Sequence, residues 1–196
     1  MIRYAIAMQK VHFIGICGKG MSGLAVMLKN QGYTVTGSDG GFFDPTATYL
    51  KKHGVDFFTS YAALNIPNDT DAIVIGKHSK LTEENPEVTA AFASGKKIYS
   101  LPSFLAQQIK DRTQIVITGS FGKSTCTGLT SWILEKNETH PGYFVGGEVH
   151  KMENSAMFGQ PPYFIIEGDE YPSANFDDQA KFLHFNPNIL MLTSAE

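Results

Sequence analysis

Short apolar runs alternate with segments of helical pattern along this chain, and this alternation restricts its fold more than any other feature. Asp44 and Asn85 each precede a proline, as helix N-cap residues often do, and Gly32, Gly54 and Gly95 stand where helix C-caps are expected. Strands joined by helices are typical of a parallel sheet. We therefore predict an α/β fold whose first domain, residues 1–110, is a Rossmann-like, doubly wound parallel sheet. Its expected strands lie at residues 11–14, 34–36, 55–58, 72–75 and 97–99.

A second alternation begins near Gln114, after the polar stretch 107–112. It predicts a second domain, residues 111–196, which resembles the beginning of an α/β domain of the P-loop type. The expected elements are strands at 115–118, 143–145, 163–166 and 189–193 and a helix at 123–134.

Charge and composition exclude several classes of partner. The 196 residues carry a formal net charge of −3, and their lysines and arginines form no cluster that would suit nucleic acid. We read Lys77 and Lys80 as solvated loop charges. No apolar run approaches the roughly 18 residues of a membrane span, so no membrane partner is expected. The two cysteines, Cys17 and Cys126, lack metal-type or redox-type neighbours, which fits a reduced cytoplasm.

The first glycine-rich segment follows the first expected strand. It contains G-x-G-x-x-G at Gly18, Gly20 and Gly23, and this motif opens a helix expected at 21–31. Asp39 lies about 20 residues after Gly18, where such folds place an acid against a ribose hydroxyl. The turn between the strand and the first glycine of this motif is longer than in nicotinamide-binding proteins. This longer turn favours a nucleotide diphosphate other than NAD. The alternative is that these glycines only allow tight packing of strand and helix.

The second glycine-rich segment reads G-x-x-G-K-S-T and lies between a strand and a helix. It is shorter than a standard Walker loop, yet Gly119 and Gly122 would still let a triphosphate approach the backbone. Lys123 would reach the β- and γ-phosphates, and Ser124 or Thr125 would bind Mg²⁺. The alternative is an ordinary glycine turn with a lysine facing solvent.

Acidic and polar side chains follow two other expected strands. Glu167, Asp169 and Glu170 come directly after the strand at 163–166, and carboxylates beside a phosphate loop are suitable Mg²⁺ ligands. Glu167 is the best candidate, and the alternative is a solvated acidic loop. His78 and Ser79 follow the strand at 72–75 and should face the ligand edge of the first sheet.

Two nucleotide sites in series, one with G-x-G-M-S-G and one with G-x-x-G-K-S-T followed by Glu-Gly-Asp-Glu, are similar to the Mur ligase family of peptidoglycan synthesis. The run Glu-Gly-Asp-Glu-Tyr most resembles the branch that joins UDP-N-acetylmuramate to L-alanyl-γ-D-glutamyl-meso-diaminopimelate in peptidoglycan recycling. The branch that adds L-alanine shares the paired motifs and is the alternative. A nucleotide-sensing module without chemistry is a second alternative, and a Rossmann oxidoreductase ranks last because it leaves the Gly-Lys-Ser-Thr loop unexplained.

The resemblance implies an ATP-dependent carboxylate-amine ligase that uses Mg²⁺ and forms an acyl phosphate before the amine attacks. It implies a UDP-sugar site in the first domain, at Gly18, Gly20, Met21, Ser22, Ser38, Asp39, His78 and Ser79. It implies an ATP site in the second domain, at Gly119, Ser120, Phe121, Gly122, Lys123, Ser124 and Thr125. Lys123 and Glu167 would be catalytic, and Ser124 and Glu167 would hold the metal.

Two departures from the family pattern matter. Phe121 stands where the family usually has histidine, which removes one polar contact and leaves the backbone of the loop intact. A family metal ligand, the histidine of an Asp-His pair, falls shortly after the position of Glu196. The resemblance therefore implies a fragment without ligase turnover, in which the ATP domain is truncated. The sequence indicates neither the amine substrate nor an oligomeric state.

Overall fold

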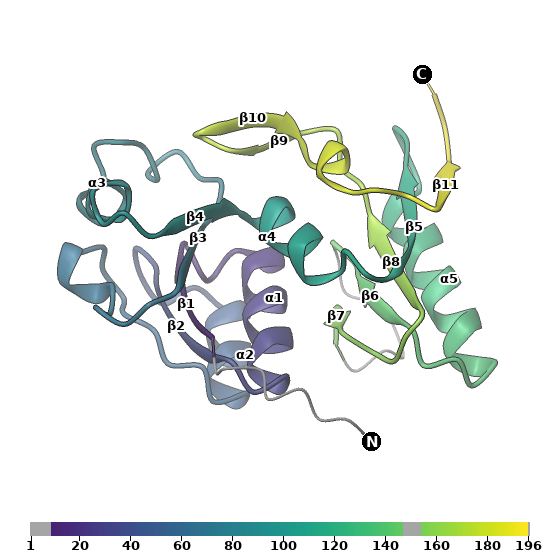
Figure 1. Cartoon of the computed structure of the whole chain (residues 1–196), viewed down its shortest axis with the longest axis horizontal. Coiled ribbons are helices and arrows are strands. Elements are labelled where there is room, and N and C mark those ends of the chain that lie inside the picture. Colours follow the sequence, from purple (N-terminus) through teal and green to yellow (C-terminus); the bar gives the residue numbers. More distant parts are fainter. Residues whose placement is uncertain (1–8, 147–153, 196) are drawn as a thin grey trace. The chain divides into compact units, whose positions relative to one another are not determined.

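The computed structural model describes residues 9–146 and 154–195. The chain divides into two compact units, Met1–Tyr99 and Ser100–Glu196, and each is described by itself (Figure 1). The division between the units precedes the helix α4 (Leu101–Gln108), whereas the predicted domain boundary follows this helix, between residues 110 and 111.

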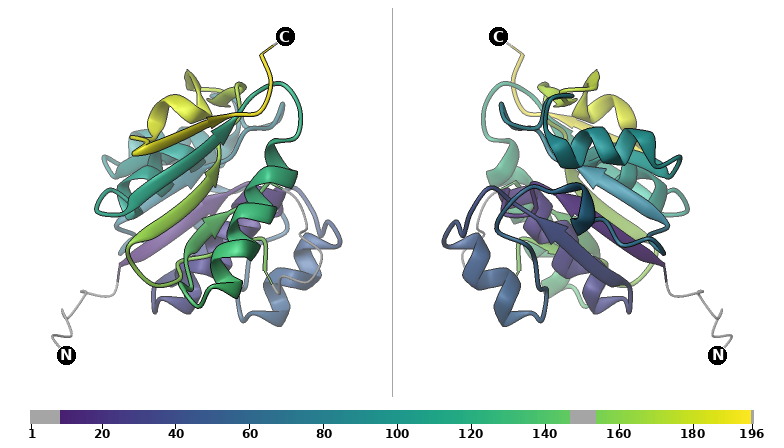
Figure 2. Two further views of the ribbon diagram at one scale, coloured as in Figure 1. Left: turned by 90° about the vertical axis from the view of Figure 1, so that its right-hand side faces the viewer. Right: turned by 90° about the vertical axis from the view of Figure 1, so that its left-hand side faces the viewer.

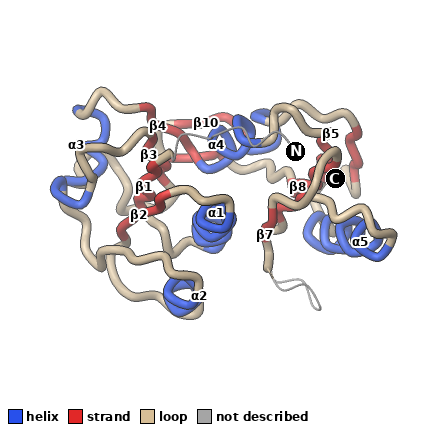
Figure 3. Tube along the Cα trace, turned by 60° about the horizontal axis from the view of Figure 1, so that its bottom comes forward, coloured by secondary structure: helices blue, strands red, loops and turns tan. Residues whose placement is uncertain are grey.

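The first unit is built around a four-stranded sheet in the order β2-β1-β3-β4. The central strand β1 pairs in parallel with both β2 and β3, and helices α1 and α3 lie on opposite faces of the sheet (Figure 3). The prediction of a parallel, two-sided sheet is thereby confirmed. Its elements are β1 (Lys10–Ile14), α1 (Lys19–Asn30), β2 (Thr34–Ser38), α2 (Thr46–Lys52), the 3-10 helix η1 (Ala63–Asn65), β3 (Ala72–Ile75), α3 (Pro86–Ala93) and β4 (Lys97–Ser100).

Several helix ends of this unit follow the local signals in the sequence, but Asp44 is not the N-cap of α2, because the helix starts one residue later and Pro45 takes that position. The Asn85 side chain caps α3 by accepting hydrogen bonds from the backbone of Glu87 at 3.0 Å and of Val88 at 3.2 Å. Gly32, Gly54 and Gly95 have φ values of 89°, 69° and 68°, the left-handed conformation that suits a glycine after a helix.

The strand predicted at residues 55–58 is wrong. Only an isolated bridge between Ser38 and Phe58 forms there. The backbone N–H of Val55 donates to Leu50 O at 3.0 Å, at the end of α2, so it is not available to a sheet. Because α2 holds the start of this segment, only its last residue reaches the edge of β2.

The second unit contains a five-stranded sheet in the order β11-β5-β8-β6-β7. All neighbours are parallel except β7, which runs antiparallel to β6, so the sheet is mixed. A separate antiparallel hairpin is formed by β9 and β10. Helix α5 runs along the sheet (Figure 2). The elements are α4 (Leu101–Gln108), β5 (Thr113–Thr118), α5 (Lys123–Lys136), β6 (Gly142–Phe144), β7 (Ala156–Met157), β8 (Tyr163–Glu167), β9 (Pro172–Ala174), β10 (Asp177–Ala180), the 3-10 helix η2 (Lys181–His184) and β11 (Ile189–Leu192).

Each sheet carries its own apolar core, as expected for strands that are covered by other elements. In the first unit, Ile14, Ile73 and Ile75 are almost fully buried. In the second, Ile117 and Ile165 are fully buried. Within the described ranges, no helix combines the length and the apolar character needed to cross a membrane.

Candidate functional sites

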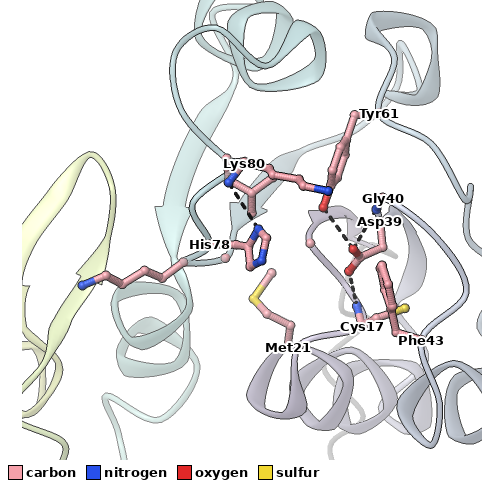
Figure 4. A pocket seen from close by; sticks show the side chains of 13 residues that line it. Cys17, Met21, Asp39, Gly40, Phe43, Tyr61, His78 and Lys80 are labelled. Atoms are coloured by element: carbon pink, nitrogen blue, oxygen red, sulfur yellow. Dashed lines mark hydrogen bonds between the residues drawn. The ribbon is translucent and has the colours of Figure 1, made fainter.

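The first site lies where the order of strands in the first sheet reverses. The chain passes from β1 to β2 on one side of β1 and then to β3 on its other side, and loops at such a point diverge to leave a crevice. The loops after these three strands line a cavity of about 290 Å³ (Figure 4). Its lining consists of Gly15, Cys17, Gly18, Met21, Asp39, Gly40, Phe43, Tyr61, Gly76, Lys77, His78, Lys80 and Leu81.

The structure brings four of the predicted UDP-sugar residues together around this cavity, namely Gly18, Met21, Asp39 and His78. The other four do not line it. Gly20 lies in the first turn of α1, and Ser79 lies in the exposed loop after β3. Ser22 is buried and its hydroxyl donates to Lys19 O at 3.0 Å. Ser38 is also buried, and its side chain belongs to an internal network.

Asp39 is held in one orientation by three donors. Its Oδ2 accepts from the backbone N–H of Cys17 at 2.8 Å. Its Oδ1 accepts from the backbone N–H of Gly40 at 2.7 Å and from the hydroxyl of Tyr61 at 3.0 Å. Because a carboxylate offers about four acceptor positions, a ligand hydroxyl can still bind. Burial, followed by the charge of Asp39, raises the pKa of Tyr61, which therefore stays protonated and keeps donating.

Cys17 contributes its backbone to this arrangement, and its thiol is protonated at neutral pH. Burial, together with the charge of Asp39, raises the pKa of the Cys17 thiol to about 11. The hydroxyl of Thr46 donates to Cys17 O at 2.6 Å, which further fixes the turn. The Cys17 thiol therefore contributes no negative charge to the cavity at neutral pH.

Ser38 participates in a buried polar network centred on Glu87. Oε1 of Glu87 accepts from the Ser38 hydroxyl at 2.7 Å and lies 2.7 Å from Nε2 of His12. Oε2 accepts from Ala62 N and from the amide of Asn65, both at 3.0 Å. The His12 and Glu87 side chains are fully buried. The network ties β1 and β2 to α3 beneath the loops of the cavity.

Sequence reasoning missed several residues of the cavity. Lys77 and Lys80 are exposed, but they line the cavity with His78, so they are more than solvated loop charges. The Lys80 side chain extends toward Tyr61 (Figure 4). Both lysines lie in the loop after β3, and the reasoning that selected His78 could have selected them. Tyr61 and Phe43 carry no local motif that would have revealed them.

The second site lies at the end of β5. Gly122 has a φ of 82° and is the N-cap of α5, and the first hydrogen bond of the helix is donated by Cys126 to Gly122 O. The backbone N–H groups of Lys123, Ser124 and Thr125 therefore lack acceptors within the helix. They lie at the positive end of the helix dipole, which favours an anion.

Lys123 is oriented back across the loop. Its Nζ donates to Gly119 O at 2.8 Å and pairs with Glu170 at 3.0 Å. Burial opposes the charge of Lys123, but the hydrogen bond and charge of Glu170 outweigh it, and the pKa of Lys123 is raised. Lys123 is thus a cation at neutral pH, available to phosphate once it leaves Glu170.

Glu167 ends β8, the parallel neighbour of β5, and its carboxylate faces the loop. Oε1 accepts from the Ser124 hydroxyl at 2.7 Å, and Oε2 accepts from Gly146 N at 2.7 Å. One hydroxyl and one carboxylate suit Mg²⁺, which takes its remaining ligands from phosphate and water. Within the described ranges, no three His, Cys, Asp or Glu side chains are grouped to hold a metal without such help.

Known proteins match this chain over most of its length. A profile described as "Mur ligase family, catalytic domain" matches residues 10–113. The UDP-N-acetylmuramate–L-alanyl-γ-D-glutamyl-meso-2,6-diaminoheptandioate ligases of Haemophilus influenzae and Escherichia coli are each 36% identical over 95% of this chain, which spans 41% of each relative. The UDP-N-acetylmuramate–L-alanine ligase of Desulforamulus reducens is 35% identical over 96% of this chain and 39% of its own length.

Solved structures of ligases are also similar to this chain. The UDP-N-acetylmuramate:L-alanyl-γ-D-glutamyl-meso-diaminopimelate ligase from Neisseria meningitides superposes with a TM-score of 0.89 at 31% identity, over 97% of this chain and 61% of that one. A murein peptide ligase from Psychrobacter arcticus superposes with a TM-score of 0.86 at 30% identity, over 96% of this chain and 43% of that one. The chain thus spans about two fifths of the length of the curated relatives.

Proposed function

Because this chain belongs to the Mur ligase family, we propose that it supplies the UDP-sugar site and the phosphate-binding loop of an ATP-dependent ligase that joins a carboxylate to an amine. The observation that carries this proposal is the 2.7 Å hydrogen bond between Ser124 and Glu167, beside Lys123. It brings together the three side chains that a magnesium-bound triphosphate requires.

We propose UDP-N-acetylmuramate as the nucleotide sugar and the tripeptide L-alanyl-γ-D-glutamyl-meso-diaminopimelate as the amine, in peptidoglycan recycling. The names and 36% identity of the Haemophilus and Escherichia relatives support this choice. L-alanine is the alternative amine, supported by the Desulforamulus relative at 35% identity. The two unpaired cysteines are consistent with a cytoplasmic location.

In the first unit, the proposed roles follow from the charges around the cavity. Asp39 would accept a hydroxyl of the ribose, since Cys17, Gly40 and Tyr61 leave one acceptor position open. The N-terminus of α1 would receive the diphosphate, and Lys77 and Lys80 would add positive charge at the same mouth.

In the second unit, Lys123 would leave Glu170 and neutralise charge on the β- and γ-phosphates, while the first N–H groups of α5 bind phosphate oxygens. Ser124 and Glu167 would hold Mg²⁺, which supplies further positive charge to the transferring phosphoryl group. The sugar carboxylate would attack that group to give an acyl phosphate and release ADP, and the amine would then attack the acyl carbon and displace phosphate.

Calorimetric titration tests the proposal at both sites. The chain should bind UDP-N-acetylmuramate more tightly than NAD, and it should bind MgATP. Lys123→Ala should weaken MgATP binding and leave the nucleotide-sugar affinity unchanged, because Lys123 belongs to the second unit. A preference for NAD, or unchanged MgATP affinity in the variant, would contradict the proposal.

A further inference from the structure

The two residues after β11 hold the phosphate loop by its backbone. Strand β11 pairs with β5 in parallel register, with Leu192 opposite Thr118. This register places Thr193 and Ser194 beside the loop that follows β5. Ser194 accepts hydrogen bonds from two backbone N–H groups of this loop. The Ser194 carbonyl oxygen accepts from Ser120 N at 3.2 Å, and the Ser194 hydroxyl accepts from Phe121 N at 2.9 Å.

Thr193 holds the same loop from its carbonyl side. Its hydroxyl lies 2.5 Å from Phe121 O and 3.1 Å from Thr118 O, and its backbone N–H donates to Thr118 O at 2.9 Å. Gly119 leaves room for this contact, since a Cβ there would lie 2.4 Å from Thr193 Oγ1. Both polar backbone groups of Phe121 are therefore bound by the segment after β11.

We infer that Thr193 and Ser194 are positioning residues for the phosphate loop, and we call the pair the loop clamp. This inference rests on the proposed MgATP site. The loop is shorter than a Walker loop, and Ile117 stands where that loop has a glycine. The loop clamp fixes the backbone of this shorter loop. It engages the N–H groups of Ser120 and Phe121, so the N–H groups at the start of α5 are the ones left to bind the phosphates.

The loop clamp changes the expected role of two residues. The resemblance implies that Ser120 and Phe121 belong to the ATP site, and in this structure their backbone N–H groups donate to Ser194. The contacts of the loop clamp with residue 121 use only the backbone of Phe121 and do not involve its side chain. Phe121 is 69% exposed as a residue, and the position of the loop depends on its backbone.

Amide hydrogen exchange tests the loop clamp without any nucleotide. Ser194→Ala removes the acceptor for the Phe121 N–H and should speed its exchange about tenfold. Ser194→Thr keeps a hydroxyl and should restore protection. The Cys126 amide, which donates to Gly122 O within α5, should be unchanged in both variants. Unchanged exchange at Phe121, or equal acceleration at Cys126, would overturn the inference.

Nucleotide affinity tests the consequence. Ser194→Ala should weaken MgATP binding roughly 3- to 10-fold, and Ser194→Thr should recover it. Ser155→Ala is the matched control, since the Ser155 side chain makes no hydrogen bond within the described ranges. Equal affinity of Ser194→Ala and the parent chain would contradict the inference. If the parent chain binds no MgATP, the proposed function fails, while the exchange experiment still decides on the loop clamp.

Discussion

The hydroxyl of Ser124 donates a 2.7 Å hydrogen bond to Oε1 of Glu167, across 43 residues of sequence. Ser124 lies in the first turn of α5, and Glu167 is the last residue of β8. Parallel pairing of β5 with β8, with Ile117 opposite Glu167, brings the two together. The carboxyl ends of adjacent parallel strands thus bring the proposed phosphate loop and the proposed metal ligand Glu167 to one edge of the sheet.

Removing the hydroxyl of Tyr61 should weaken binding of the nucleotide sugar. Tyr61→Phe keeps the ring and removes one of the three donors that orient Asp39. We expect about tenfold weaker binding of UDP-N-acetylmuramate by calorimetry, or about 1.4 kcal/mol. Tyr163→Phe, a tyrosine of the second unit, should have no effect. Equal affinities of Tyr61→Phe and the parent chain would show that Asp39 does not need this donor.

Removing Glu87 should destabilise the first unit. Glu87→Ala leaves His12, Ser38 and Asn65 without their buried acceptor. We expect a loss of about 3 to 5 kcal/mol in the free energy of unfolding, measured with urea. Glu83→Ala, at an exposed position, should change stability by less than about 0.5 kcal/mol. A small effect of Glu87→Ala would mean that water satisfies the network.

Alkylation of Cys17 should be slow at neutral pH and accelerate only in strong alkali. Its pKa of about 11 leaves roughly one thiolate in a thousand at pH 8. The pKa of the folded Cys17 thiol lies above its ordinary value of 9.0, so the associated stabilisation is complete below that pH and is lost as the pH rises toward 11. Iodoacetamide labelling of a Cys126→Ser variant would measure Cys17 alone. A rate that levels off near pH 8 would contradict the raised pKa.

Much of the fold could be predicted because its signals are local. The strands β1, β3 and β8 are apolar runs, and Asn85 before Pro86 marks the start of α3. The hairpin of β9 and β10 was missed, because Asp177–Ala180 is polar and has no alternating pattern. The segment at 55–58 was misassigned, because the hydrogen bond from Val55 to Leu50 depends on where α2 ends.

In the candidate sites too, residues marked by a local motif were predicted, and residues positioned by distant segments were missed. Asp39 and Lys123 were found because a glycine-rich motif precedes each at a known spacing. Tyr61 was missed because its contact with Asp39 depends on the course of the loop between β2 and β3. Ser194 was missed because its contact with Phe121 depends on the pairing of β11 with β5. Contacts between distant segments leave no mark in the sequence around either residue.

The most direct test of the account is the magnesium dependence of ATP affinity in Glu167→Gln. In the parent chain, Mg²⁺ should strengthen ATP binding, because Glu167 and Ser124 provide oxygen ligands beside the phosphates. In Glu167→Gln, which removes the charge and keeps the shape, calorimetry should show nearly equal ATP affinities with and without Mg²⁺. An undiminished effect of Mg²⁺ in the variant would contradict the assignment of Glu167, and with it the central claim about this site.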